Sequence, residues 1–111
     1  MEIIFHAHHA DISPRLQQRA DASLRKIVAR LGRAVDAIVR VEEDGPTRRV
    51  ELELHAPRGR RLVARGEARY FGPALTVALG KLGAQVKRVR KTTSGRRRVA
   101  KSRMRRKLAR V

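Results

Sequence analysis

The stretch AIVRVEEDGPTRRVELELHAPRGRRLVARGEA, residues 37–68, decides the fold. It holds three runs of β-branched or alternating apolar residues, which predict strands at residues 37–43, 49–56 and 61–68. Asp44-Gly45-Pro46 and Pro57-Arg58-Gly59 separate these runs and are typical turn sequences. Links this short favour an antiparallel meander of three strands.

The alternation within these strands predicts a sheet with one buried and one solvated face. The expected inner positions of the second and third runs are Val50, Leu52, Leu54, Ala56, Leu62, Ala64, Gly66 and Ala68. The expected solvated face carries Glu42, Glu51, Glu53 and Glu67, with few basic residues nearby in the sequence. We therefore do not expect nucleic acid to bind this face.

A strand and a helix are predicted before the meander. The β-branched and aromatic run at residues 2–7 favours a strand. Ser13-Pro14 then supplies an N-cap serine and a proline at the first helical position. Gly32 is placed to end the helix, which we expect at about residues 14–31.

A second amphipathic helix is predicted after the meander, from Gly72-Pro73 to about residue 91. Gly80 and Gly83 lie inside it, and each costs about 1 kcal/mol of helix stability relative to Ala. Either these glycines interrupt the helix, or they let a partner approach its backbone closely.

The predicted order is β-α-β-β-β-α, which makes an α+β fold of two layers, with two helices packed on one face of a four-stranded sheet. We expect this domain to span residues 1–91. Residues 92–111 hold nine Lys or Arg and no acid. This basic C-terminal segment cannot bury enough apolar surface to fold alone, although weak helical spacing would let it become helical on a partner.

The charge of the chain indicates a polyanionic partner. Twenty-eight Lys and Arg stand against ten Asp and Glu among 111 residues, a formal net charge of +18. Arg outnumbers Lys by 22 to 6, and guanidinium groups suit phosphate and nucleobase contacts. There is no cysteine, no run of about 20 apolar residues that could span a membrane, and no secretion signal, so a cytoplasmic location is expected.

The helices carry the basic residues that we expect to contact phosphate. At helical pitch Arg15, Arg19, Lys26, Arg30 and Arg33 fall on one flank of the first helix, over a length of about 25 Å. Lys81 and Arg88 share a flank of the second helix, with Lys87 and Lys91 further round. In the C-terminal segment the candidates are Arg96, Arg97 and Arg98. Because Phe5, Tyr70 and Phe71 are the only aromatic residues, recognition of RNA backbone and shape is expected, not of base sequence.

No residue pattern favours catalysis, a cofactor or a small-molecule substrate. His6, His8 and His9 lack a further ligand at metal-binding spacing, so we expect no metal site. Ser13 is explained as a helix cap, and Glu51 and Glu53 lie in an exposed alternating strand. Arg58-Gly59-Arg60-Arg61 is either an additional phosphate contact or a solvated turn.

Local strings resemble a known family. Ala7-His8-His9-Ala10-Asp11-Ile12-Ser13 is similar to the Gly-His-His-x-Glu-Ile-Thr motif of the ribosome hibernation-promoting factors, also called ribosome-associated inhibitors or sigma-54 modulation proteins. Lys81-Leu82-Gly83-Ala84-Gln85-Val86-Lys87-Arg88 resembles the family's Lys-Leu-Glu-Arg-Gln-Leu-x-Lys. The resemblance covers residues 1–91. Tyr70-Phe71-Gly72 departs from the family's usual Asp-x-Tyr, and we expect a short-form member without the dimerisation domain of long members.

The resemblance implies a non-enzymatic hibernation factor that responds to stress. It would occupy the mRNA and tRNA channel of the small ribosomal subunit, compete with mRNA and tRNA, and contact rRNA. The positions that match the family's basic helix surface are Arg25, Lys26, Lys81, Lys87, Arg88 and Lys91.

Two alternatives from other classes stay open. The first is a general chaperone of double-stranded RNA or other nucleic acid, since the predicted topology is near that of double-stranded RNA-binding domains. The second is recruitment of a membrane surface or a protein partner by the basic C-terminal segment. Specific saturation of ribosomes would separate the first alternative from a hibernation factor, and deletion of residues 92–111 would test the second.

Overall fold

The computed structural model describes residues 1–89 and confirms the β-α-β-β-β-α order. Four strands, one long helix and a short turn of 3-10 helix come first: β1 (Glu2–His8), α1 (Pro14–Leu31), β2 (Asp36–Asp44), β3 (Thr47–His55), η1 (Pro57–Gly59) and β4 (Arg61–Ala68). The second helix follows from residue 71 and is described up to residue 89. Its predicted end at residue 91 and the C-terminal segment lie outside the described residues.

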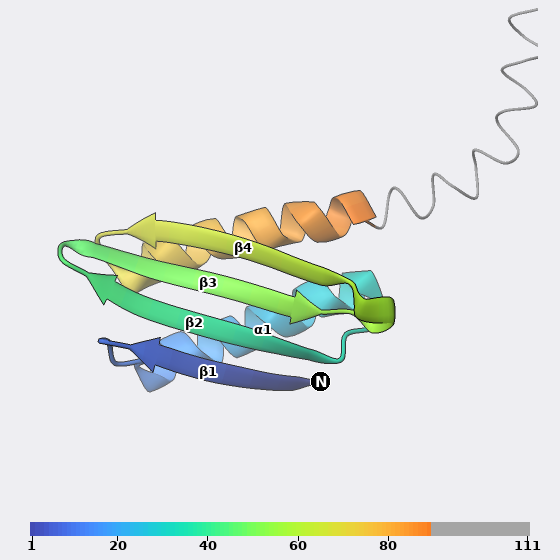
Figure 1. Cartoon of the computed structure of the whole chain (residues 1–111), viewed down its shortest axis with the longest axis horizontal. Coiled ribbons are helices and arrows are strands. Elements are labelled where there is room, and N and C mark those ends of the chain that lie inside the picture. Colours follow the sequence, from blue (N-terminus) through green and yellow to red (C-terminus); the bar gives the residue numbers. More distant parts are fainter. Residues whose placement is uncertain (90–111) are drawn as a thin grey trace, which may run out of the picture.

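The sheet order is β1-β2-β3-β4, with β1 parallel to β2 and the other pairs antiparallel. The parallel pair follows because α1 crosses between these two strands. Both helices lie on the same side of the sheet and run in the same direction, α1 behind β1 and β2 and the second helix along β4 (Figure 1). The first turns of the two helices are therefore at the same end of the molecule.

The ends of α1 are formed by the residues that the sequence indicates. The hydroxyl of Ser13 accepts a hydrogen bond from the amide of Leu16, and Pro14 is the first helical residue. The amide of Gly32 donates to the carbonyl oxygen of Val28 at φ 93°, a conformation that glycine adopts without the steric penalty of a side chain.

The core lies between the sheet and the helices. Inner positions of β2 and β3 meet two leucines of the second helix and Leu24 of α1. Burying each such leucine contributes roughly 1.5–3 kcal/mol. The largest fully buried side chains are Leu24, Leu52, Leu54, Leu75, Leu82, Val39, Val41, Val50 and Val86.

The second helix approaches β4 very closely at Gly66. A Cβ atom at this position would lie 2.0 Å from the carbonyl oxygen of Ala74 and 2.6 Å from the amide nitrogen of Ala78. Only a glycine lets these backbones meet. By contrast, Gly80 and Gly83 have open space around them and do not interrupt the helix within the described range.

Candidate nucleic-acid interface

The outer face of the sheet, on the side away from the helices, collects most of the acidic residues. Strand partners share a face, so the register and the burial pattern identify the outward positions. Seven of the ten acids lie at outward positions: Glu2, Asp36, Glu42, Asp44, Glu51, Glu53 and Glu67. Four arginines, Arg40, Arg49, Arg61 and Arg65, lie among them.

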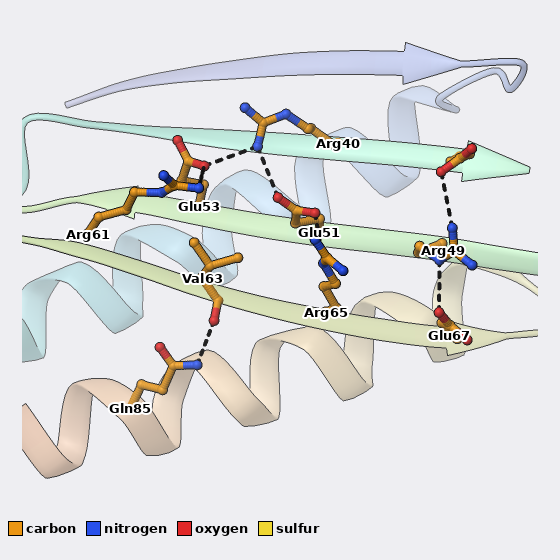
Figure 2. Close-up of polar contacts among 10 residues, drawn as sticks. Arg40, Arg49, Glu51, Glu53, Arg61, Val63, Arg65, Glu67 and Gln85 are labelled. Atoms are coloured by element: carbon orange, nitrogen blue, oxygen red, sulfur yellow. Dashed lines mark hydrogen bonds and ion pairs between the residues drawn. The ribbon is translucent and has the colours of Figure 1, made fainter.

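These outward arginines are engaged with the acids (Figure 2). Arg40 reaches the carboxylates of Glu51 and Glu53 at 3.2 and 3.3 Å. Arg65 pairs with Glu51 at 2.9 Å, and Arg61 pairs with Glu53 at 3.0 Å. Few basic residues were expected near these glutamates along the sequence, but the strand register brings Arg40, Arg61 and Arg65 to them from neighbouring strands.

A second cluster forms toward the β2–β3 turn. Arg49 lies 2.8 Å from Glu67 on β4 and 3.3 Å from Glu42 on β2. Acids outnumber arginines at the outward positions, so the outer face has no net positive charge to attract phosphate. This charge balance agrees with the expectation that nucleic acid does not bind this face, which stays a prediction.

Glu53 corrects the expectation of an exposed strand face. Glu53 is only 6% exposed, because the side chains of Arg40, Arg61 and His55 cover it. Burial alone would raise the pKa of Glu53, but hydrogen bonds from His55 and Arg40 and the positive charges of Arg61 and Arg40 outweigh burial and lower it. The Glu53 hydrogen bond in turn raises the pKa of His55, against the effect of burial and with help from Asp36.

The helix layer has the opposite character. Arg19 of α1 donates to the carbonyl oxygen of Gly72 at 2.9 Å and to the hydroxyl of Thr76, both in the second helix. Since Arg15, Lys26 and Arg30 share the flank of Arg19 at helical pitch, the predicted basic flank lies on the side of α1 that faces the second helix. Arg33 was wrongly assigned to this flank, because α1 ends at Leu31 and Gly32 turns the chain out of the helix before Arg33. All five side chains are exposed.

Arg25 is separate from this flank. Its guanidinium pairs with Asp21 at 2.7 Å, one turn earlier in α1, and reaches the carbonyl oxygen of Met1. This places Arg25 on the side of α1 next to β1. The structure therefore does not bring Arg25 together with the other predicted helix residues.

The basic residues of the second helix divide between its two sides. Gln85 donates to the carbonyl oxygen of Val63 at the free edge of β4 (Figure 2). At helical pitch Lys81 and Arg88, four and three residues away, lie on the same side of the helix. Lys87 instead continues the stripe through Gly72, Thr76 and Gly83 that faces α1. Lys91, Arg96, Arg97 and Arg98 lie outside the described residues.

Most of these helix cations are free. Within residues 1–89, no ion pair or hydrogen bond engages the side chains of Arg15, Lys26, Arg30, Arg33, Lys81, Lys87 and Arg88. Asp11 and Asp21 are the acids nearest in sequence, and Asp21 is paired with Arg25. The helix layer therefore presents exposed, uncompensated positive charge, which suits a polyanion.

A cavity of about 360 Å³ opens where the first turns of the two helices meet. Its walls include Asp11, Arg15, Leu16, Arg19 and Phe71. No sequence pattern connects these residues, because Phe71 is more than 50 residues away from the others.

The structure gives less support to a metal site or a membrane-spanning helix in the part of the chain that is described. His6 and His8 both lie on the outer sheet face, opposite Arg40 and Glu42 of β2. No group of three His, Cys, Asp or Glu residues there could hold a metal ion. None of the described helices is long and apolar enough to span a bilayer.

Comparisons with known proteins agree with this architecture. The sequence model of the sigma 54 modulation protein / S30EA ribosomal protein family matches residues 3–93. A ribosomal subunit interface protein from Coxiella burnetii has a similar fold, with a TM-score of 0.74 and 19% identity over 80% of this chain and 97% of that chain. The Thermus thermophilus Protein Y N-terminal domain is also similar, with a TM-score of 0.68 and 20% identity over 79% of this chain and 94% of that chain. No curated protein sequence matches the chain.

Proposed function

Because this chain belongs to the sigma 54 modulation protein / S30EA ribosomal protein family, we propose that it is a non-enzymatic inhibitor of translation that binds idle ribosomes. It would occupy the mRNA and tRNA channel of the small subunit. The name of the Coxiella burnetii relative, a ribosomal subunit interface protein, is consistent with this location.

The observation that carries the proposal is the difference between the two layers. Arginines of the sheet are paired with glutamates, whereas the basic side chains of the helices, apart from Arg19 and Arg25, are exposed and unpaired among the described residues. The helix layer would therefore face rRNA. Arg15, Lys26 and Arg30 would contact phosphates along α1, and Lys87 would contact them from the second helix.

The mechanism is steric exclusion supported by electrostatic affinity. Each phosphate neutralised by Lys or Arg releases condensed counterions, so binding strengthens as the salt concentration falls. Once seated, the folded domain fills space that mRNA and tRNA require. No step of this mechanism needs a cofactor or a chemical reaction.

Co-sedimentation tests the proposal. The purified full-length chain is mixed with bacterial small subunits and with whole ribosomes, at low and moderate salt, with and without excess tRNA. We expect saturation near one copy per small subunit and displacement by tRNA. Binding that does not saturate and is indifferent to tRNA would instead establish a general nucleic-acid chaperone, and the channel-blocking function would be withdrawn.

A further inference from the structure

The cavity between the first turns of the helices has one aromatic wall and one cationic wall. Phe71 and Leu16 give it an apolar interior, and Arg15 and Arg19 stand one helical turn apart at its rim.

One residue of each wall, Arg19 and Phe71, already has a contact partner within the domain. The guanidinium of Arg19 is fixed by hydrogen bonds to the carbonyl oxygen of Gly72 and the hydroxyl of Thr76. The ring of Phe71 has the guanidinium of Arg48 5.9 Å from its centroid. A preorganised cavity binds a flat ring at a smaller entropy cost than a mobile surface does.

Two polar side chains of the cavity, those of Asp11 and Arg15, are available to a ligand. Asp11 and Arg15 are exposed, and no hydrogen bond or ion pair within the described residues engages either side chain. The ionised carboxylate of Asp11 only accepts hydrogen bonds, whereas Arg15 only donates them. A ligand that fits must therefore combine an apolar ring, a donor for Asp11 and an anion for Arg15.

We propose that this cavity seats one unpaired RNA base that carries an exocyclic amino group, with the base against Phe71, its amino group on Asp11 and its phosphate on Arg15. Bases splayed from single-stranded RNA are recognised in this way, by stacking and by hydrogen bonds to their edges. The inference rests on the proposed RNA binding and adds one base-specific contact to recognition of backbone and shape.

The carboxylate makes the choice of base testable. Cytosine presents an amino donor at the position where uracil presents a carbonyl oxygen. Asp11 would accept a hydrogen bond from cytosine, but its charge would face an acceptor oxygen in uracil. CMP and UMP carry the same phosphate and ribose and therefore form a matched pair of probes.

The experiment is a titration of the full-length chain with CMP, UMP and ribose 5-phosphate, followed by NMR. We expect CMP to shift the Gly72 amide, the Leu16 methyl groups and the Phe71 ring signals with saturation. UMP should bind there several-fold more weakly, and ribose 5-phosphate should leave the Phe71 signals unchanged. Equal shifts with all three probes, or shifts that omit Phe71, would refute the base seat.

Two variants locate the interaction. Asp11→Ala should remove the preference for CMP over UMP, whereas Glu2→Ala, which deletes an exposed acid on the outer sheet face, should keep it. Phe71→Leu should weaken CMP binding roughly tenfold, as expected for loss of one base-aromatic stack. Tyr70→Leu, at an exposed aromatic outside the cavity, is its control.

Measurements of folding and of ribosome binding distinguish failure of the base seat from failure of the proposed function. Thermal unfolding shows whether Phe71→Leu remains folded, and exposed Asp11 provides an independent test if it does not. A chain that saturates small subunits but does not distinguish CMP from UMP disproves the base seat alone. A chain that prefers CMP but does not saturate small subunits contradicts the proposed function and leaves the base seat established.

Discussion

Arg19 in α1 donates a hydrogen bond to the carbonyl oxygen of Gly72, 53 residues later in the sequence, with 2.9 Å between nitrogen and oxygen. The same guanidinium reaches the hydroxyl of Thr76, which itself donates to Gly72 at 3.1 Å. These three residues join the first turns of the two helices. They also fix the direction of the basic flank, because Arg19 belongs to it.

Arg19→Ala should destabilise the domain by about 1 kcal/mol, the range for a charge-assisted but solvent-exposed hydrogen bond. Arg15→Ala, one turn away and without a partner in the described part, should have a smaller effect. Urea denaturation measures both free energies of unfolding. Equal losses would show that Arg19 does not join the helices.

Gly66→Ala should destabilise the domain by about 1–3 kcal/mol or more, because its Cβ would overlap backbone atoms that cannot move independently. Gly80→Ala is the matched control in the same helix–strand unit. Its Cβ meets open space, so better helix propensity should stabilise the domain by up to about 1 kcal/mol. Thermal unfolding should therefore shift in opposite directions for the two variants, and a shared direction would contradict the close packing.

His55 should make stability depend on pH. It contacts Asp36 on β2 and lies 2.5 Å from one carboxylate oxygen of Glu53. Arg40 and Arg61 contact the other carboxylate oxygen of Glu53. Its pKa is raised above 6.5, so its contribution is complete below pH 6.5 and is lost as the pH rises through the folded-state pKa. The pKa of Glu53 is lowered below 4.5, so its contribution is present above pH 4.5 and is lost as the pH falls through the folded-state pKa.

Denaturation across pH 4 to 9 checks the His55 prediction. His55→Gln should remove the loss of stability on the alkaline side. His6→Gln, on the same face of the sheet but without a carboxylate partner among residues 1–89, should retain it. An unchanged alkaline slope in His55→Gln would assign that slope to another group.

Arg30→Gln should weaken ribosome binding and reduce the slope of log affinity against log salt by about 1, because it removes one free phosphate contact. Arg65→Gln deletes the same charge from the outer sheet face, where Glu51 already neutralises it. It should leave the salt slope nearly unchanged. Binding isotherms at four salt concentrations compare the two variants, and equal slopes would refute an oriented interface.

The sequence predicted the architecture because the hydrophobic pattern and the turns agree with each other. Ser13-Pro14 and Gly32 mark the ends of α1 accurately, and Gly66 was correctly placed on the inner face. The two-residue turn at Gly45-Pro46 also determines the register of β2 against β3, so Arg40 must oppose Glu51. This signal was present in the sequence and could have revealed the first ion pair.

Other contacts required the three-dimensional structure. The link between β3 and β4 contains Arg58 in the left-handed region, at φ 68°. The sequence does not indicate this conformation, so it does not determine which residues of β3 and β4 are opposite each other. The pairing of Arg65 with Glu51 could therefore not be predicted. The side of α1 that faces the second helix depends on how helices pack, which periodicity does not specify. The cavity at Phe71 follows from that packing. The roles of the helix cations in RNA binding stay predictions.

The segregation of acids to the outer sheet face and free cations to the helix layer gives the folded domain a dipole moment directed through its thickness. Close to a polyanionic surface, this moment produces a torque that turns the helices toward the surface before contact. Docking of two specific patches is ordinarily slowed by the need for correct orientation. Here more of the random approach angles would lead to productive capture, and this gain in association rate would fade as salt screens the field.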